Sequence, residues 1–193
     1  MKIAVIGKGN VGTALAEGLR RAGHEIKFGH RDPKESVPEA AKWGEIIILA
    51  IPFSAVKSTV KEFGPASDGK VLVDVTNALG PNMELAVGFT TSGAEELQRL
   101  LPKTQIVKAF NTVFAQNQST GKVGKESLSA FIAGDDSKAK QVVMQLARDI
   151  GFDPIDVGPL RSARYLEPMA MLVIGLGYGM KMGTKIGLKL IRA

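Results

Sequence analysis

Three glycines near the N-terminus have the spacing of a phosphate-binding turn. Gly7, Gly9 and Gly12 follow the apolar run MKIAVI and precede a helix predicted over residues 13–22 (TALAEGLRRA). The first glycine would permit a tight turn off a buried strand, the second would leave room for a pyrophosphate, and the third would let the helix pack closely. Free N–H groups at the start of that helix would bind the anion. The pattern predicts a dinucleotide site, with a purely structural turn as the alternative. Its residues would be Gly7, Lys8, Gly9, Asn10, Val11 and Gly12.

Basic residues follow a second predicted strand, over residues 25–28. The strand leads into Gly29, His30 and Arg31, and Lys34 comes soon after. In dinucleotide sites of this kind an acidic residue at this place accepts from the ribose of NAD, whereas a cation binds the 2′-phosphate of NADP. A guanidinium suits phosphate because it can donate two charge-assisted hydrogen bonds. We therefore expect NADP, bound by His30, Arg31 and Lys34. The alternative is that these are ordinary solvated charges on a loop.

The composition excludes several kinds of chemistry. The 193 residues include no cysteine, so disulfides, thiolate metal sites and cysteine nucleophiles are excluded. The only histidines are His24 and His30, too few for a histidine-rich metal site. The net charge of +6 favours anionic ligands, and no recognised nucleic-acid motif accompanies it. Because the first residues are a predicted strand and not a signal peptide, we expect a cytoplasmic protein with no membrane and no specific nucleic-acid partner.

Apolar strand-like runs alternate with helix-like segments along the chain, which is typical of an α/β fold. We predict a Rossmann-type, doubly wound parallel sheet with right-handed crossovers. The nucleotide-binding domain would cover residues 1–160, and a C-terminal helical extension would cover 161–193, in one compact unit. Further strands are predicted over residues 46–50, 70–75, 105–110, 128–133 and 154–157, with a loop over 116–125. Further helices are predicted over 54–63, between Ser92 and Pro102, and from Asp135, Asp136 and Ser137 to Ile150.

Ligands of such sheets bind beyond the carboxyl ends of the strands, where the strand order reverses. We expect residues 50–53 and 109–112 to meet the glycine turn and Arg31 there. Asparagine side chains would supply neutral hydrogen-bonding groups near the nicotinamide, although they also serve strand-terminal turns. The predicted contacts of these segments and of the end of the fourth strand are Ile51, Pro52, Phe53, Asn77, Ala109 and Asn111.

The C-terminal region leaves more than one interpretation open. Residues 169–180 (MAMLVIGLGYGM) are apolar but too few to span a bilayer, so they would form a dimer interface, an acceptor pocket or a core helix. Lys181, Lys185 and Lys189 recur every four residues and predict a basic stripe on a helix. The stripe is either a solvated face or a surface that attracts an acidic cofactor tail. Asp74 is interpreted as a polar residue near a strand end, and the Asp135-Asp136 pair as a helix cap.

Several motifs together resemble one family. The sequences are IGKGNVGTALA, GHR, AIPFSAV, VKAFNTVFAQN, DVGPL and RSARYLEPMAML. They resemble the NADP-dependent oxidoreductases of the deazaflavin coenzyme F-420, and are similar to the oxidoreductase domain of the six-transmembrane ferric reductases. The resemblance implies hydride transfer between NADP(H) and coenzyme F-420, FMN or FAD in a homodimer. Carried over, the phosphate loop falls on Lys8, Gly9, Asn10 and Val11, the 2′-phosphate site on His30 and Arg31, and the nicotinamide site on Ile51, Pro52, Ala109 and Asn111.

Two departures leave the acceptor open. Archaeal members of the family have histidine where Asn111 stands, and hydroxyl residues in the stretch that corresponds to residues 167–170 (EPMA). Hydride transfer depends on holding two rings face to face, so we assign no catalytic acid, base or metal. The alternatives are a nucleotide-binding sensor or partner subunit without catalysis, and a reductase of a small imine or carbonyl substrate.

Overall fold

The computed structural model describes residues 1–192, which form a seven-stranded sheet in the order β2-β1-β3-β4-β5-β8-β9. Neighbouring strands are parallel except for β5 and β8, which pair antiparallel. The doubly wound α/β class expected from the sequence is therefore confirmed. The strands are β1 (Lys2–Ile6), β2 (Glu25–Gly29), β3 (Ile46–Leu49), β4 (Val71–Asp74), β5 (Gln105–Lys108), β8 (Ser129–Gly134) and β9 (Asp153–Asp156).

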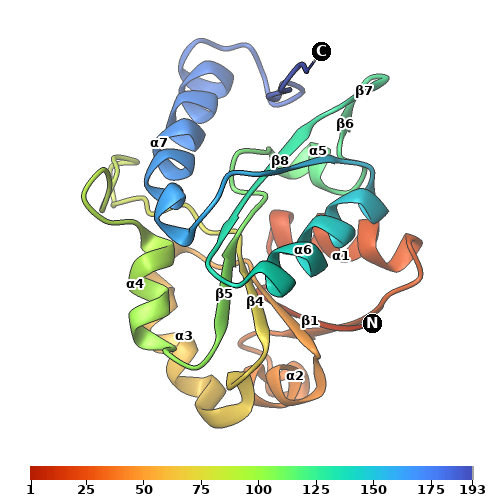
Figure 1. The fold of residues 1–193 in the computed structure, drawn as a ribbon, viewed down its shortest axis with the longest axis vertical. Helices are drawn as coiled ribbons and strands as arrows, with labels where there is room; N and C mark the ends of the chain where they lie inside the picture. Colours follow the sequence, from red (N-terminus) through yellow and green to blue (C-terminus); the bar gives the residue numbers. More distant parts are fainter. Residues whose placement is uncertain (193) are drawn as a thin grey trace.

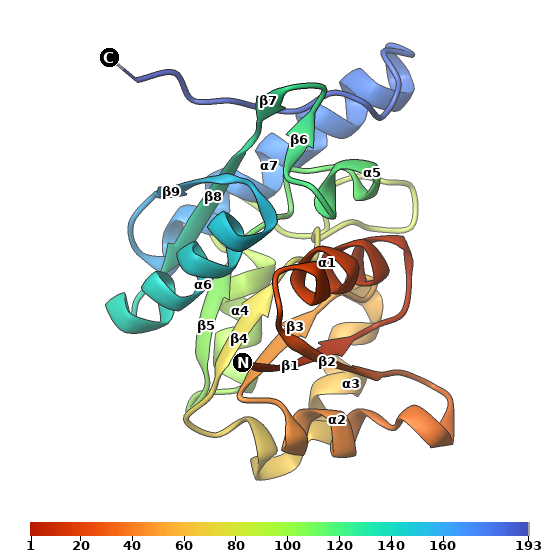
Figure 2. The same ribbon diagram turned by 90° about the vertical axis from the view of Figure 1, so that its right-hand side faces the viewer.

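Helices cover both faces of the sheet (Figures 1 and 2). One face packs against α1 (Asn10–Arg21) and α6 (Ser137–Ile150), and the other against α2 (Val37–Trp43), α3 (Val56–Phe63) and α4 (Gly93–Leu100). Successive side chains of a strand point to opposite faces. In β1, Ile3 and Val5 accordingly belong to the α1 side, whereas Ala4 and Ile6 belong to the α2 side. Burial on both faces explains why the strands are nearly continuous apolar runs.

The antiparallel pairing of β8 corrects the expectation of a fully parallel sheet. A parallel connection needs a crossover of a dozen or more residues, usually a helix. Between β5 and β8 the chain forms only α5 (Ala115–Gln118) and the hairpin of β6 (Lys122–Val123) and β7 (Glu126–Ser127). No crossover helix is available, so the chain turns back along β5. Part of α5 and all of β6 lie in the region that was expected to be a loop.

The C-terminal extension is helical only in its first part. Helix α7 (Ala163–Ile174) continues into a π-helical turn, Gly175–Gly179, after which no helix is formed up to residue 192. Lys181 and Gly183 have positive φ angles of 57° and 80°, which a right-handed helix does not permit. The prediction of a stripe of lysines on a helix is therefore wrong. Lys189 instead pairs with Glu126 of β7, and the backbone of Leu188 accepts from the Ser129 N–H of β8 at 2.9 Å.

Candidate functional site

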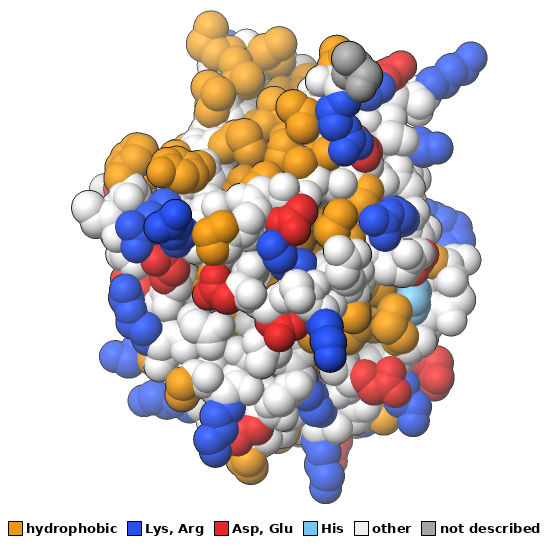
Figure 3. All heavy atoms as spheres, in the orientation of Figure 1, with side chains coloured by type: hydrophobic (Ala, Val, Ile, Leu, Met, Phe, Trp, Pro, Cys, Tyr) orange, Lys and Arg blue, Asp and Glu red, His pale blue; other side chains and the backbone are white. Residues whose placement is uncertain are grey.

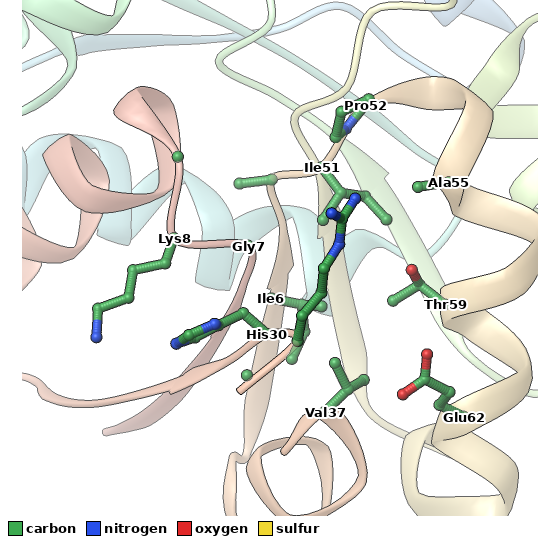
Figure 4. A pocket seen from close by; sticks show the side chains of 14 residues that line it. Ile6, Gly7, Lys8, His30, Val37, Ile51, Pro52, Ala55, Thr59 and Glu62 are labelled. Carbon is green, nitrogen blue, oxygen red and sulfur yellow. The ribbon is translucent and has the colours of Figure 1, made fainter. Parts of the chain in front are cut away.

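A cavity of about 350 Å³ opens beyond the carboxyl ends of β1 and β3, where the strand order reverses (Figure 4). The glycine turn, the end of β2, the segment after β3 and helix α3 form its walls. We call it the Gly7 cavity. Its lining residues are Ile6, Gly7, Lys8, Gly9, Gly29, His30, Arg31, Val37, Ala50, Ile51, Pro52, Ala55, Thr59 and Glu62.

The three glycines of the turn are needed for different reasons. Gly7 has a φ of +108°, and a side chain there would overlap the backbone of Ala50. A side chain at Gly12 would overlap the carbonyl of Gly7, so this glycine lets α1 approach the turn. Gly9 differs, since its φ is −80° and a methyl group there would meet no atom of the described residues within 4 Å. The fold needs Gly7 and Gly12, whereas Gly9 keeps open a space outside the protein that a ligand can enter.

The N-terminus of α1 has unsatisfied donors beside that space. Gly9 is the N-cap residue and has no side chain to accept from the first N–H groups, and the first turn contains no acidic residue. The first intrahelical bond runs from the Thr13 N–H to the Gly9 carbonyl at 2.9 Å. The N–H groups of the preceding residues of the helix thus face outward at the positive end of its dipole. These groups fit a pyrophosphate, as the glycine spacing predicted.

Basic side chains gather at the β2 end of the Gly7 cavity. Lys8 and His30 lie next to each other, and Thr59 and Glu62 of α3 face them across the cavity (Figure 4). One carboxylate oxygen of Glu35 contacts both bases, at 2.7 Å from the Lys8 Nζ atom and in a shorter contact with the His30 imidazole. Hydrogen bonds from Lys8, and then from His30, hold the pKa of Glu35 below its ordinary value.

A second cavity, of about 270 Å³, lies at the carboxyl ends of β4 and β5 against α7. We call it the Asn111 cavity. The glycine turn contributes to this cavity as well as to the first, so α1 begins between the two. The lining residues are Asn10, Val11, Asn77, Met83, Asn111, Thr112, Val113, Phe114, Ala115, Gln116, Ala170, Val173, Ile174 and Tyr178.

The Asn111 side chain is fixed by its neighbours but keeps one free acceptor. Its amide nitrogen donates to the Asn77 Oδ1 atom at 3.1 Å and to the Leu166 carbonyl at 2.9 Å. The Asn77 amide in turn donates to the Asn111 carbonyl at 3.1 Å. The preceding residue, Phe110, has a φ of 63°, which turns the chain sharply after β5. The Asn111 Oδ1 atom is buried and accepts from no group of residues 1–192.

The predicted site residues are distributed over these cavities as follows. The Gly7 cavity contains Gly7, Lys8, Gly9, His30, Arg31, Ile51 and Pro52, and the Asn111 cavity contains Asn10, Val11, Asn77 and Asn111. Four predicted residues line neither. Gly12 packs against the turn, Ala109 is fully buried, Lys34 lies on the exposed loop after β2, and Phe53 lines a groove between α3 and α4.

A buried charge cluster beside the Asn111 cavity was missed by the sequence analysis. Lys108 of β5 lies 3.0 Å from a carboxylate oxygen of Asp74 and 3.0 Å from one of Glu167, and all three residues are at most 1% exposed. Burial alone lowers the pKa of Lys108, but the two carboxylates outweigh burial and hold it above its ordinary value. Asp74 and Lys108 are register partners in β4 and β5. Opposite charges at matched positions of two apolar runs were the signal that could have revealed the pair.

The same cluster attaches α7 to α4. Gly93 and Ala94 are the first residues of α4. Their N–H groups donate to the Glu167 carboxylate at 2.9 and 3.2 Å. One turn earlier in α7, Arg164 donates two hydrogen bonds to Glu95, at 2.7 and 2.9 Å. Two side chains on one face of α7 thus bind the start of α4, and these contacts hold the wall that α7 contributes to the Asn111 cavity.

A doubly wound sheet with this glycine turn and an uncapped α1 defines a Rossmann-type dinucleotide-binding protein. Residues 2–78 match the family described as NADP oxidoreductase coenzyme F420-dependent. The chain is 32% identical over 209 residues to the F420-dependent NADP reductase of Methanothermobacter marburgensis, an alignment that covers 91% of this chain and 92% of that protein. The chain belongs to the F420-dependent NADP reductase family, a family of NADP-dependent oxidoreductases.

Two further similarities agree with this family. Metalloreductase STEAP3 of Rattus norvegicus is 31% identical over 186 residues, which cover 90% of this chain but only 37% of that protein. The chain thus spans a little over a third of the length of its metalloreductase relatives. A crystal structure from Arthrobacter sp. FB24, whose description proposes an F420-dependent NADP reductase, is 30% identical with a TM-score of 0.92 and full coverage of both chains.

Proposed function

We propose that this protein transfers a hydride between NADP(H) and a deazaflavin or flavin acceptor. The observation that carries the proposal is the position of α1, whose uncapped N-terminus lies between two cavities lined by the same glycine turn. A dinucleotide whose pyrophosphate binds these N–H groups would place its adenosine in the Gly7 cavity and its nicotinamide in the Asn111 cavity. The two cavities on either side of the start of α1 would thus receive the two halves of one cofactor.

The residues of the chain would bind and orient the cofactor. Arg31 would bind the 2′-phosphate. Ile51 and Pro52 line the Gly7 cavity, so they would pass over the adenosine and not, as the family resemblance implied, lie at the nicotinamide. The free Oδ1 atom of Asn111 would accept from the nicotinamide carboxamide, since a buried acceptor without a donor is unfavourable. Bound NADPH would supply the hydride, so the protein has to provide position and exclude water. Apolar side chains of α7 would exclude water from the Asn111 cavity.

The lining of the Asn111 cavity supports direct hydride transfer. Among the described residues that form it, none carries a carboxylate, an imidazole or an amine. The neutral lining suits a reaction in which no proton is moved at the transferring carbon. The names of the NADP reductase relatives favour coenzyme F-420 as the acceptor. The resemblance to the ferric reductases implies a flavin. A sensor that binds NADP(H) without turnover is the second candidate.

Assembly and cellular location are separate proposals. Apolar side chains gather on α7 and the segment after it (Figure 3), where Tyr165, Leu172, Tyr178 and Met180 are each at least 60% exposed. We propose that a second copy covers this surface, and a measured mass of one chain at micromolar concentration would contradict the dimer. A cytoplasmic location stays a prediction. In residues 1–192, no helix is long and apolar enough to cross a bilayer.

The test is NADPH oxidation by the purified protein with coenzyme F-420, FMN or FAD, and with NADH as the control donor. Turnover with one of the acceptors supports the proposal and identifies the acceptor, whereas NADPH binding without any turnover favours the sensor. Arg31→Ala should weaken NADPH at least tenfold more than NADH, because only NADPH carries the 2′-phosphate. Lys34→Ala is the matched control, since Lys34 lies on the same loop outside the cavity. Equal weakening of both nucleotides by Arg31→Ala would remove the 2′-phosphate assignment.

A further inference from the structure

The two bases at the β2 end of the Gly7 cavity, Lys8 and His30, already bind an anion that belongs to the protein. Glu35 ends the short 3-10 turn Pro33–Glu35 after β2. The turn returns to the edge of the strand, because the His30 N–H donates to the Glu35 carbonyl at 2.8 Å. The Glu35 side chain then reaches the same histidine and Lys8 with a single carboxylate oxygen. Backbone and side chain together therefore place this carboxylate on two of the cavity's bases.

The contacts of Glu35 are those that a phosphate oxygen would make. An ammonium and an imidazole converge on one oxygen, which is how charge-assisted hydrogen bonds hold a phosphate. Lys8 and His30 both line the Gly7 cavity, whereas Glu35 itself does not. A phosphate that enters the cavity would thus bind the same two bases that Glu35 binds.

Of the described charged groups around the cavity, only Lys8 and His30 are bases that Glu35 binds and that a phosphate could also bind. The guanidinium of Arg31 forms no hydrogen bond or ion pair with any group of residues 1–192, so it needs no displacement before it binds a phosphate. The Asp32 carboxylate accepts a hydrogen bond from the nearby Lys34 N–H at 2.9 Å. Glu62 of α3 faces the cavity from the opposite wall.

Release of Glu35 requires little rearrangement. Its side chain is 34% exposed, and that of Lys8 is 47% exposed, so the carboxylate can turn into water without crossing the core. An exposed side chain changes rotamer in picoseconds to nanoseconds. The bound and the released positions of Glu35 can therefore exchange rapidly on the time scale of nucleotide binding.

We propose that the Glu35 carboxylate is an internal competitor for the 2′-phosphate of NADP(H), which occupies Lys8 and His30 in the free protein and yields them to the nucleotide. The inference rests on the proposed function, in which the Gly7 cavity binds NADP(H). The competition weakens NADPH and NADP⁺ alike and leaves NADH unaffected, since NADH has no group that replaces the carboxylate on these bases.

The test is calorimetric titration of NADPH and NADH into wild type, Glu35→Gln and Glu39→Gln. Glu39 is an exposed residue of α2, so its variant has the same net charge without the contacts to the two bases. We expect Glu35→Gln to tighten NADPH about three- to tenfold, a range set by a solvent-exposed charged contact, and to change NADH less than twofold. Glu39→Gln should change both less than twofold. In a Lys8→Met background, Glu35→Gln should tighten NADPH by a smaller factor, because one of the two bases for which Glu35 competes has been removed.

Each other outcome overturns the inference in a recognisable way. If Glu35→Gln weakens NADPH, Glu35 organises the two bases and does not compete for them. If it weakens NADH selectively, Glu35 accepts from the ribose 2′-hydroxyl. Unchanged binding of both nucleotides removes any role for the contact. If wild type binds neither nucleotide, it is the proposed function that fails, and the two failures are thus distinct.

Discussion

Replacing Lys108 by methionine would leave two carboxylates buried without their cation. Lys108 donates to the Asp74 carboxylate at 3.0 Å and to the Thr76 carbonyl at 2.6 Å, and lies 3.0 Å from Glu167. Methionine has a similar length and fills the same space without a charge. The substitution therefore tests the ionic contacts and changes packing little.

The expected loss follows from the complete burial of the cluster. Removing one partner of a buried ion pair typically lowers the free energy of unfolding by about 3–5 kcal/mol. In a chain of this length, each kcal/mol lowers the unfolding temperature by about 2–4 °C, so the variant should unfold roughly 6–20 °C below wild type. Because the pKa of Lys108 is raised in the folded state, its contribution to stability is fully present below about pH 10.4. The contribution is lost only as the pH rises further, so the difference should be constant around neutral pH.

Thermal unfolding followed by circular dichroism measures this difference. Lys103→Met is the matched control, since Lys103 is 75% exposed and pairs with Asp68 at the surface, and it should change the free energy of unfolding by less than about 0.5 kcal/mol. Adding Asp74→Asn and Glu167→Gln to Lys108→Met should restore much of the stability, because no unpaired charge then remains. An unfolding temperature for Lys108→Met within about 2 °C of wild type would refute the reasoning.

Two further predictions concern the glycine turn and the α7 contact. Gly9→Ala should keep the unfolding temperature near that of wild type but weaken NADPH in a titration, whereas Gly12→Ala should lower the free energy of unfolding by about 1–3 kcal/mol, because only the latter side chain meets protein atoms. Normal NADPH binding by Gly9→Ala would contradict the pyrophosphate position. Arg164→Met should lower the unfolding temperature at pH 7, and the difference should shrink as the pH falls below about 4.3, since Arg164 holds the pKa of Glu95 below its ordinary value and that contribution is lost on protonation. A pH-independent difference would mean that packing and not charge attaches α7.

The strands and helix caps could be predicted because their signals are local. Each buried strand is a short apolar run, and Ser92 and Asp136 accept the backbone N–H bonds of the caps that their sequence indicated. The direction of β8 could not be predicted, because it depends on the connection that precedes it and not on the strand itself. Helix α2 was missed because it is only seven residues long, although Ser36 and Glu39 have the capping-box spacing and Pro38 lies in its first turn.

The two cavities also differ in how far local sequence signals predict them. The glycine turn and the bases after β2 carry a recognisable spacing, so half of the residues that line the Gly7 cavity were among the predicted site residues. Lys108 was missed because a single lysine in QIVKAF looks like a solvated interruption of an apolar run. Its burial depends on Glu167, which only the placement of α7 brings close. The same placement forms the far wall of the Asn111 cavity, so that wall could not be deduced from local pattern.

The order in which the chain is synthesised separates the two halves of the site. All residues of the Gly7 cavity lie between positions 6 and 62, whereas those of the Asn111 cavity extend from position 10 to position 178. A growing chain therefore contains every residue of the Gly7 cavity, the proposed phosphate and adenosine half, long before α7 exists. The half that would receive the electron acceptor can close only after residue 178 has been synthesised. An incomplete chain could thus bind part of the cofactor, but it would lack the enclosed space in which a hydride can be passed on.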